Sequence, residues 1–241
     1  MSCDDLDELL GSDFTELFTN KSYVEHVEKL PSGKEIKFLE LEACSTASDL
    51  TGQILWPGCS LLLHWLDLNL DIFNGKTAVE LGAGTGICSL FIAKYAHPKY
   101  VFITDGNDIV TELMNQNLSK YPELSNISAA VLEWGHDNTV QLIQDTKEQT
   151  GNEKYDFVFG SEIAYNTTVA TYLTETIDEF LKPDGRFIIG HIFRYQNATD
   201  AFMNAMKKAG FIIEKEIPWD SIMNYRMELI EGSIFVFKRS N

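Results

Sequence analysis

One glycine-rich segment carries the clearest chemical signal in the sequence. Residues 79–86 read VELGAGTG, after a short apolar run and before a helix-like stretch, residues 87–95. Gly82, Gly84 and Gly86 would let the backbone turn sharply and approach a ligand that a Cβ would repel. The spacing departs from the G-x-G-x-x-G of dinucleotide-binding turns, because Ile87 takes the third glycine position, and no Lys-Ser/Thr follows to form a phosphate-binding loop. NAD and ATP are therefore the less favoured ligands.

Two carboxylates flank this turn in the expected structure. Glu80 precedes the first glycine and is expected to point toward the crevice above the strand ends, where it suits a cationic amino group. Asp105 follows the apolar run 101–104. An acid at the end of the second strand of such a sheet can accept hydrogen bonds from both hydroxyls of a ribose, although Asp105 could instead cap the helix expected from about Asp108. Together these residues predict a pocket for a nucleoside with a positively charged tail.

The elements that must position these residues form a regular pattern. Helix-like stretches separate most of a series of apolar runs bounded by turn residues, which predicts a doubly wound α/β fold with a mainly parallel sheet covered on both faces. Two more strands are expected after a helix over 198–209, for seven in all. The connection between them, 218–232, leaves little room for a crossover helix, so we expect the last strand to be antiparallel. The expected strands are 77–81, 100–104, 127–132, 156–160, 186–190, 211–217 and 233–238.

The first 33 residues differ from the rest. Between residues 6 and 18, leucine and phenylalanine recur at helical spacing and alternate with aspartate and glutamate. We therefore expect residues 1–33 to be an acidic helical extension and residues 34–241 to be the α/β domain. The extension could dock on the core as a cap, or it could be an arm that meets a basic substrate.

Several segments in order resemble one enzyme family. VELGAGTG together with TDGN at 104–107 is similar to the seven-β-strand S-adenosylmethionine-dependent methyltransferases. TGQILWP at 51–57, LEWG at 132–135 and SEIAYN at 161–166 resemble three segments of the protein-lysine methyltransferase-like branch. The resemblance covers roughly residue 34 to the end, and the combination is more specific than any single motif.

The resemblance implies S-adenosylmethionine as cofactor and assigns roles along the chain. Trp56, Trp134 and Ser161 would join Glu80, the three glycines and Asp105 in the cofactor pocket, with Trp134 stacked on the adenine. Glu162 and Tyr165 would form the catalytic pair. The usual family pattern there is D-x-x-Y, whereas this chain has E-x-x-Y, a form similar to that of relatives that methylate a protein histidine.

The expected reaction is transfer of a methyl group to a lysine side chain of a protein. Glu162 would orient the acceptor nitrogen by hydrogen bonding, and Tyr165 would position the peptide or the carboxylate. Histidine, which is largely neutral at physiological pH, is the alternative acceptor at the same site. Two further alternatives are a non-catalytic interaction module with this fold and a nicotinamide-dependent oxidoreductase.

Composition narrows the partners. The 241 residues include 19 basic and 36 acidic side chains, a formal net charge of −17. This balance argues against a protein that grips nucleic-acid phosphates and favours a protein partner with a basic region. The four cysteines are widely spaced, so we expect reduced thiols and no metal site. Without a recognisable secretory signal or membrane-spanning stretch, the expected location is cytoplasmic, with the nucleus possible in addition, and no membrane partner is expected.

Overall fold

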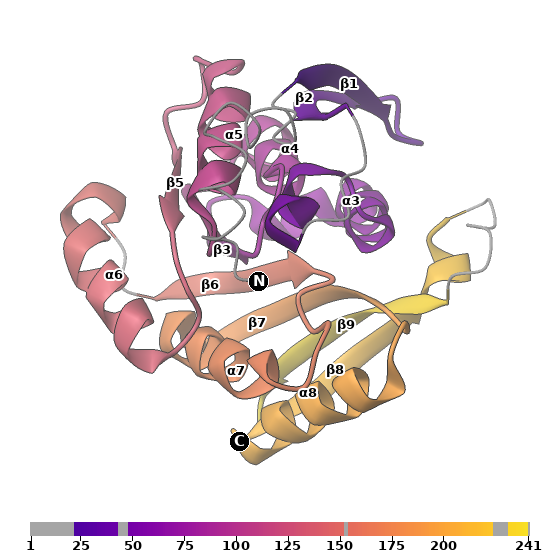
Figure 1. Ribbon diagram of the computed structural model, residues 1–241, viewed down its shortest axis with the longest axis vertical. Helices are drawn as coiled ribbons and strands as arrows, with labels where there is room; N and C mark the ends of the chain where they lie inside the picture. Colours follow the sequence, from indigo (N-terminus) through magenta and orange to yellow (C-terminus); the bar gives the residue numbers. More distant parts are fainter. Residues whose placement is uncertain (1–21, 43–47, 152–153, 224–230, 241) are drawn as a thin grey trace, which may run out of the picture.

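A seven-stranded sheet forms the centre of the computed structural model, which describes residues 22–42, 48–151, 154–223 and 231–240 (Figure 1). The strand order is β5-β4-β3-β6-β7-β9-β8. Neighbouring strands from β5 to β7 pair in parallel, whereas β9 is antiparallel to both β7 and β8. The predicted fold class and the antiparallel last strand are confirmed. The strands are β3 (Thr77–Leu81), β4 (Tyr100–Asp105), β5 (Ile127–Val131), β6 (Tyr155–Ser161), β7 (Leu181–Ile192), β8 (Phe211–Pro218) and β9 (Gly232–Arg239).

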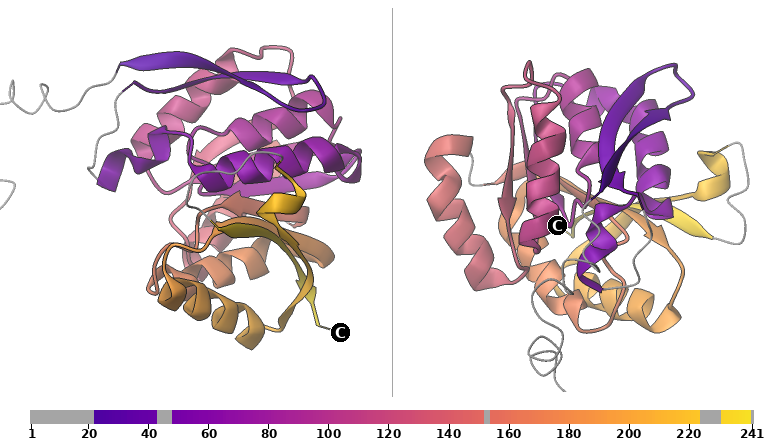
Figure 2. Two further views of the ribbon diagram at one scale, coloured as in Figure 1. Left: turned by 90° about the vertical axis from the view of Figure 1, so that its right-hand side faces the viewer. Right: turned by 45° about the horizontal axis from the view of Figure 1, so that its top comes forward.

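Helices cover the two faces of this sheet. One layer holds α3, α4 and α5, and the other holds α7 and α8 with α6 beside α7 (Figures 1 and 2). Three short 3-10 helices, η1 to η3, complete the helical elements of the described residues. The bounds are η1 (Ser48–Gln53), α3 (Pro57–Asn69), η2 (Leu70–Phe73), α4 (Ile87–Tyr95), α5 (Asp108–Ser119), α6 (His136–Thr150), α7 (Val169–Phe180), α8 (Gln196–Lys208) and η3 (Trp219–Ser221).

Alternation along the strands produces two hydrophobic cores. Ala78 of β3 belongs to the cluster under α3 and α4, whereas Val79 and Leu81 belong to the cluster under α7 and α8. Successive strand side chains point to opposite faces, so a strand with helices on both sides is apolar at nearly every position. This explains why the strands appear in the sequence as continuous apolar runs.

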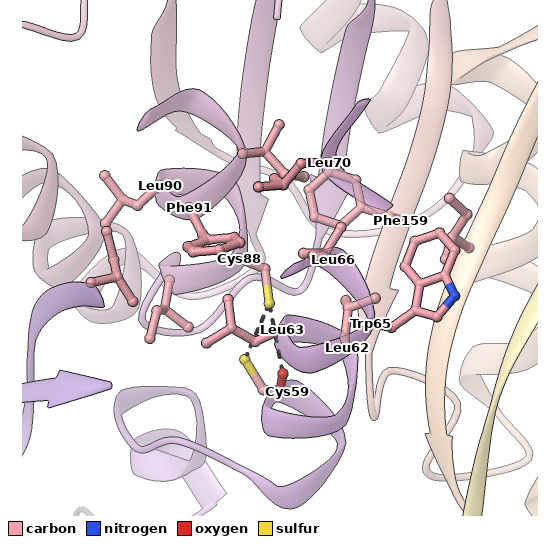
Figure 3. Close-up of a cluster of buried hydrophobic side chains, with 14 of the residues drawn as sticks. Cys59, Leu62, Leu63, Trp65, Leu66, Leu70, Cys88, Leu90, Phe91 and Phe159 are labelled. Atoms are coloured by element: carbon pink, nitrogen blue, oxygen red, sulfur yellow. Dashed lines mark hydrogen bonds between the residues drawn. The ribbon is translucent and has the colours of Figure 1, made fainter. Parts of the chain in front are cut away.

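Two buried thiols lie inside the first of these cores (Figure 3). The sulfur atoms of Cys59 on α3 and Cys88 on α4 are 3.5 Å apart, and both cysteines are free. Burial raises the pKa of the Cys88 thiol well above its ordinary value. The expectation of reduced thiols holds for this pair, while Cys3 and Cys44 lie outside the described residues.

A separate hairpin precedes the sheet. Strand β1 (Tyr23–Lys29) pairs antiparallel with β2 (Glu35–Leu41), and the hairpin packs on the outer side of α4 and α5 (Figure 2). The Asn117 side chain of α5 donates to the Leu39 carbonyl and accepts from the Leu39 amide, as a neighbouring strand would. The predicted boundary at residue 33 is therefore wrong, because it divides this hairpin, and residues 23–29 are strand rather than helix. The helix expected over residues 6–18 lies outside the described residues.

Within the described residues, none of the helices combines the length and the apolar character needed to span a bilayer.

Candidate active site

A cavity of about 740 Å³ opens at the carboxyl ends of the parallel strands. The loops after β3, β4, β5 and β6 line it, together with the segment before α3 and the turn after β7. This is the edge of an open α/β sheet at which ligands bind. Eight of the ten residues predicted for the site line the cavity: Trp56, Gly82, Gly84, Asp105, Trp134, Ser161, Glu162 and Tyr165.

Two glycines of the loop after β3 allow other segments to approach it closely. Gly82 and Gly84 have positive φ angles of 59° and 58°. A Cβ on Gly82 would lie 2.7 Å from Ile163 Cγ2, and one on Gly84 would lie 2.8 Å from the Gly52 carbonyl oxygen. Glycine is required at both positions by conformation and by space. Gly86 instead sits at the N-cap of α4 with φ 75° and does not line the cavity, so its predicted contact with a cofactor is not supported.

The Glu80 side chain turns away from the cavity, contrary to the prediction. Its Oε2 accepts hydrogen bonds from the amide and the hydroxyl of Ser89 on α4, at 3.0 and 2.5 Å. Glu80 shares the sheet face of Ala78, which lies beneath α4, so the alternation of the strand directs its carboxyl under the helix. Burial is the main cause that raises the pKa of Glu80 to about 8. Its role here is to fix α4 against β3.

Substitution of Glu80 by glutamine should change how stability depends on pH. In the folded protein the carboxyl binds a proton up to about pH 8, whereas an ordinary glutamate does so only up to about 4.5. The folded wild type therefore holds an extra proton between these values and loses stability as pH rises, by at most about 1.4 kcal/mol per unit. In urea unfolding at pH 5.5 and 7.5, the free energy of unfolding of E80Q relative to that of wild type should be higher at pH 7.5. A constant difference would contradict the buried, protonated state.

Asp105 lies deep in the cavity at the end of β4. Its Oδ2 accepts from the Gly84 amide at 3.1 Å and its Oδ1 accepts from the Asn107 amide at 3.2 Å. Burial raises the pKa of this carboxyl, and the backbone hydrogen bonds only partly oppose that effect. Asn107, rather than Asp105, caps α5, because its Oδ1 accepts from the amides of Ile109 and Val110. Asp105 is thus a desolvated carboxylate that still faces the cavity, where further hydrogen-bond donors would stabilise its charge.

Trp134 follows β5 and forms part of the cavity wall. Its ring packs near the Gly82 backbone, where a Cβ would meet Trp134 Cζ2 at 3.1 Å. Its Nε1 is buried and has no hydrogen-bond partner in the part of the chain that the structure describes. A buried, unpaired N–H next to a glycine-lined hollow fits a bound ligand with an acceptor atom. The cavity wall thus suits a nucleoside, which offers both a flat ring and hydrogen-bonding groups.

Glu162 occupies a strained and crowded position directly after β6. Its φ is 51°, in the left-handed region that side chains other than glycine seldom adopt. The Glu162 amide donates to the Gly190 carbonyl at 2.9 Å. The side chain packs closely against α3 at Gly58, because a Cβ on Gly58 would lie 2.4 Å from Glu162 Cγ. Such an outlier held by two neighbouring elements is typical of functional sites.

Arg194, in the turn after β7, pairs with Glu162. Arg194 Nε and Nη2 lie 2.9 and 2.8 Å from Glu162 Oε1. The guanidinium carbon is 5.3 Å from the centre of the Trp56 ring. Oε2 of Glu162 is buried and has no hydrogen-bond partner within the described ranges. The carboxylate is therefore held through one oxygen, and the other is unpaired there.

A small second cavity adjoins the outer end of the main one, because both are lined by Glu162, Tyr165, Arg194 and Tyr195. Tyr165 is 56% exposed and Tyr195 63%. Burial of the hydroxyl end, and then the charge of Asp105, raise the pKa of Tyr165. Two aromatic rings beside a carboxylate form an opening suited to a long, cationic side chain.

Sequence reasoning did not identify several lining residues. Some of them lie inside motifs that the sequence analysis quoted: Thr51, Gly52 and Ile54 in the segment 51–57, and Asn107 in TDGN. Val110 lies outside these motifs. It packs against Gly52, where a Cβ would lie 2.8 Å from Val110 Cγ2. Thr85, Gly106, Glu133 and Tyr195 also line the cavity and follow from their places in the loops.

Comparison with known proteins agrees with this geometry. The chain is 29% identical over 185 residues to the protein-lysine N-methyltransferase EFM3 of Chaetomium thermophilum, a match that covers 75% of this chain and 54% of that protein. This chain therefore spans about half of that relative's length. It is 25% identical over 193 residues to the protein N-terminal and lysine N-methyltransferase efm7 of Schizosaccharomyces pombe, covering 77% of this chain and 73% of that protein.

A solved structure and a family model complete the comparison. SMU.776 in complex with SAH superposes with a TM-score of 0.59 at 13% identity, covering 89% of this chain and 56% of that one, which supports the fold alone. A family model described as lysine methyltransferase matches residues 36–209. This match includes the glycine loop, Trp56, Trp134, Asp105 and the Glu162–Arg194 pair, and the chain belongs to the lysine methyltransferase family.

Proposed function

We propose that the protein transfers a methyl group from S-adenosylmethionine to a lysine side chain of a protein substrate. One observation carries the proposal. One part of a single cavity is lined by the Gly82–Gly84 loop with Asp105, and another part by Glu162, whose buried Oε2 has no partner among the residues described. The first set suits a nucleoside and the second suits a nitrogen acceptor, so the two reactants would meet in one enclosure.

The cofactor would be held by residues whose surroundings fit it. Asp105 would accept hydrogen bonds from the ribose hydroxyls, which would relieve the desolvation of its carboxylate. Trp134 and the glycine loop would enclose the adenosyl group, and Ser161 lines the same wall. When bound, the cofactor supplies an electrophilic methyl group on sulfur.

The chain's own contribution to methyl transfer is position. The acceptor nitrogen needs a free lone pair and an in-line approach at about 3 Å. Glu162 Oε2 would accept a hydrogen bond from an N–H group of that nitrogen and thereby orient it. Tyr165 and Tyr195 would contact the alkyl stem of the incoming side chain at the outer end of the cavity.

The substrate we propose is a protein with a basic region around the acceptor. The chain carries a net charge of −17, and three carboxylates line the cavity: Asp105, Glu133 and Glu162. An acidic surface attracts basic partners and raises their rate of encounter. The relatives named above are protein methyltransferases, in agreement with a protein acceptor.

Histidine is the second candidate acceptor, because the motif here is S-E-x-x-Y-N and glutamate reaches one methylene farther than the usual aspartate. Incubation with tritium-labelled S-adenosylmethionine and a fractionated lysate tests both acceptors. We expect a labelled protein band, with the methyl group mapped to lysine by mass spectrometry. Label on histidine would support the second candidate, and label only in small metabolites would contradict both.

A further inference from the structure

Arg194 stands at the centre of the acceptor end of the cavity. It follows β7 in a tight turn in which its amide donates to the Ile192 carbonyl at 2.9 Å. Among the described residues, it is the one lysine or arginine that lines either cavity. Its side chain is 36% exposed, whereas that of Glu162 is 13% exposed. The Glu162 carboxylate is therefore largely withdrawn from water, where charges interact more strongly than on an open surface, whereas the Arg194 guanidinium is exposed and partly screened by solvent.

A lysine acceptor creates a difficulty for an unpaired carboxylate at this place. A lysine has a reference pKa of about 10.4, so at neutral pH only about one molecule in a thousand has the free lone pair that methyl transfer requires. A nearby carboxylate favours the charged ammonium and makes that fraction smaller. Glu162 alone would thus bind the acceptor in the form that cannot react.

The contacts of Arg194 address this difficulty. Both nitrogens in contact with Glu162 bond to Oε1, so the positive charge offsets the carboxylate while Oε2 keeps its lone pairs. The Trp56 ring under the guanidinium is itself fixed, because Trp56 Nε1 donates to the Thr51 carbonyl at 2.6 Å. Arg194 is therefore held on two sides.

Resting on the proposed lysine acceptor, we propose that Arg194 is a positioning residue that offsets the charge of Glu162. The carboxylate can then accept a hydrogen bond from an N–H group of the neutral amine without stabilising the protonated ammonium form. The amine loses its proton to water before it binds productively. Its lone pair then forms the N–C bond as the C–S bond breaks with its electron pair left on sulfur, and the positive charge passes from sulfur to nitrogen.

Other titratable groups around the site belong to several elements, and each is common to wild type and variant. They are Asp105 after β4, Glu133 after β5, Tyr165 after β6, His191 on β7, Tyr195 before α8 and Cys59 on α3. Burial lowers the pKa of His191 to about 4, so this side chain stays neutral above pH 6. A change in the pH profile on replacing Arg194 therefore reports on the Glu162–Arg194 pair rather than on His191.

The first test is the pH dependence of kcat for R194Q, with the protein band labelled by wild type as the acceptor. Loss of the offsetting charge should move the rising limb of the profile about one unit to higher pH. At pH 7.5 this corresponds to a roughly tenfold fall in kcat with KM for the acceptor unchanged or lower. R194K, which keeps the charge, should recover most of the shift. R186Q is the matched control. Arg186 forms a comparable pair with Glu214, in which Arg186 Nε lies 2.6 Å from Glu214 Oε2, and neither residue lines either cavity.

A uniform loss of activity in R194Q at all pH values, or a gain at neutral pH, would overturn the inference. The second test separates it from the proposed function. With adenosylhomocysteine present, n-butylammonium chloride should bind R194Q several-fold more tightly than wild type in an NMR titration, since the carboxylate is then uncompensated. Equal affinity overturns the inference even if wild type labels no protein. A wild type that labels no protein while R194Q binds the probe more tightly supports the charge offset and contradicts the proposed function.

Discussion

Replacing Glu162 with glutamine is expected to lower kcat for methyl transfer about a hundredfold or more, as for loss of a positioned polar group in the transition state. The amide oxygen of glutamine can still accept from Arg194, so the local structure should survive. The amide nitrogen, however, would place a donor where Oε2 now offers an acceptor. The affinity for adenosylhomocysteine should change less than about twofold, because Glu162 is assigned to the acceptor.

Single-turnover kinetics and calorimetry of E162Q separate these two effects. E214Q is the matched control, because it removes the same charge and weakens a pair with Arg186 that lies on β7 and β8, outside the residues that line either cavity. Its kcat should stay near that of wild type. An equal loss of cofactor affinity in E162Q would show that Glu162 belongs to the cofactor half of the cavity.

Substitution of Asp105 by alanine is expected to have the opposite signature. Loss of a charged hydrogen-bond acceptor should weaken adenosylhomocysteine binding by about 1.5–3 kcal/mol, roughly tenfold to 150-fold. The loss also removes the acceptor for the Gly84 and Asn107 amides, so part of the effect would act through the loops that enclose the ligand.

Calorimetry on D105A and D105N measures this effect, and thermal unfolding confirms that both variants fold. At saturating cofactor, methyl transfer by D105A should return to within a few-fold of wild type, because Asp105 does not contact the acceptor. Unchanged affinity in D105A would reject the proposed contact with the ribose.

The sheet could be predicted closely because its strands are covered on both faces. Residues 77–81 and 87–95 were expected as strand and helix, and the structure places β3 and α4 at the same bounds. Strand β1 gave no such signal, because it is mostly exposed and carries Glu25, Glu28 and Lys29. The position of the hairpin depends in part on the Asn117 side chain, 78 residues from Leu39 in the sequence.

The sequence predicted most of the residues that line the site, but it predicted the directions of their side chains less well. The motifs brought Asp105, Trp134 and Glu162 to one cavity, as expected. The predicted direction of the Glu80 side chain is wrong, although the alternation of β3 already directs this side chain toward the helix that carries Ser89. The pairing of Arg194 with Glu162 could not be predicted, because Glu162 lies 32 residues earlier and the pairing depends on the adjacent ends of β6 and β7.

The proposed function requires that the cavity between Asp105 and Glu162 holds the cofactor. A crystal structure with adenosylhomocysteine tests it directly. We expect the ribose hydroxyls within hydrogen-bond distance of Asp105, the adenine against Trp134 and the sulfur directed toward the Glu162 and Tyr165 end. Ligand density outside this cavity, or a ribose that does not contact Asp105, would contradict the proposed cofactor site.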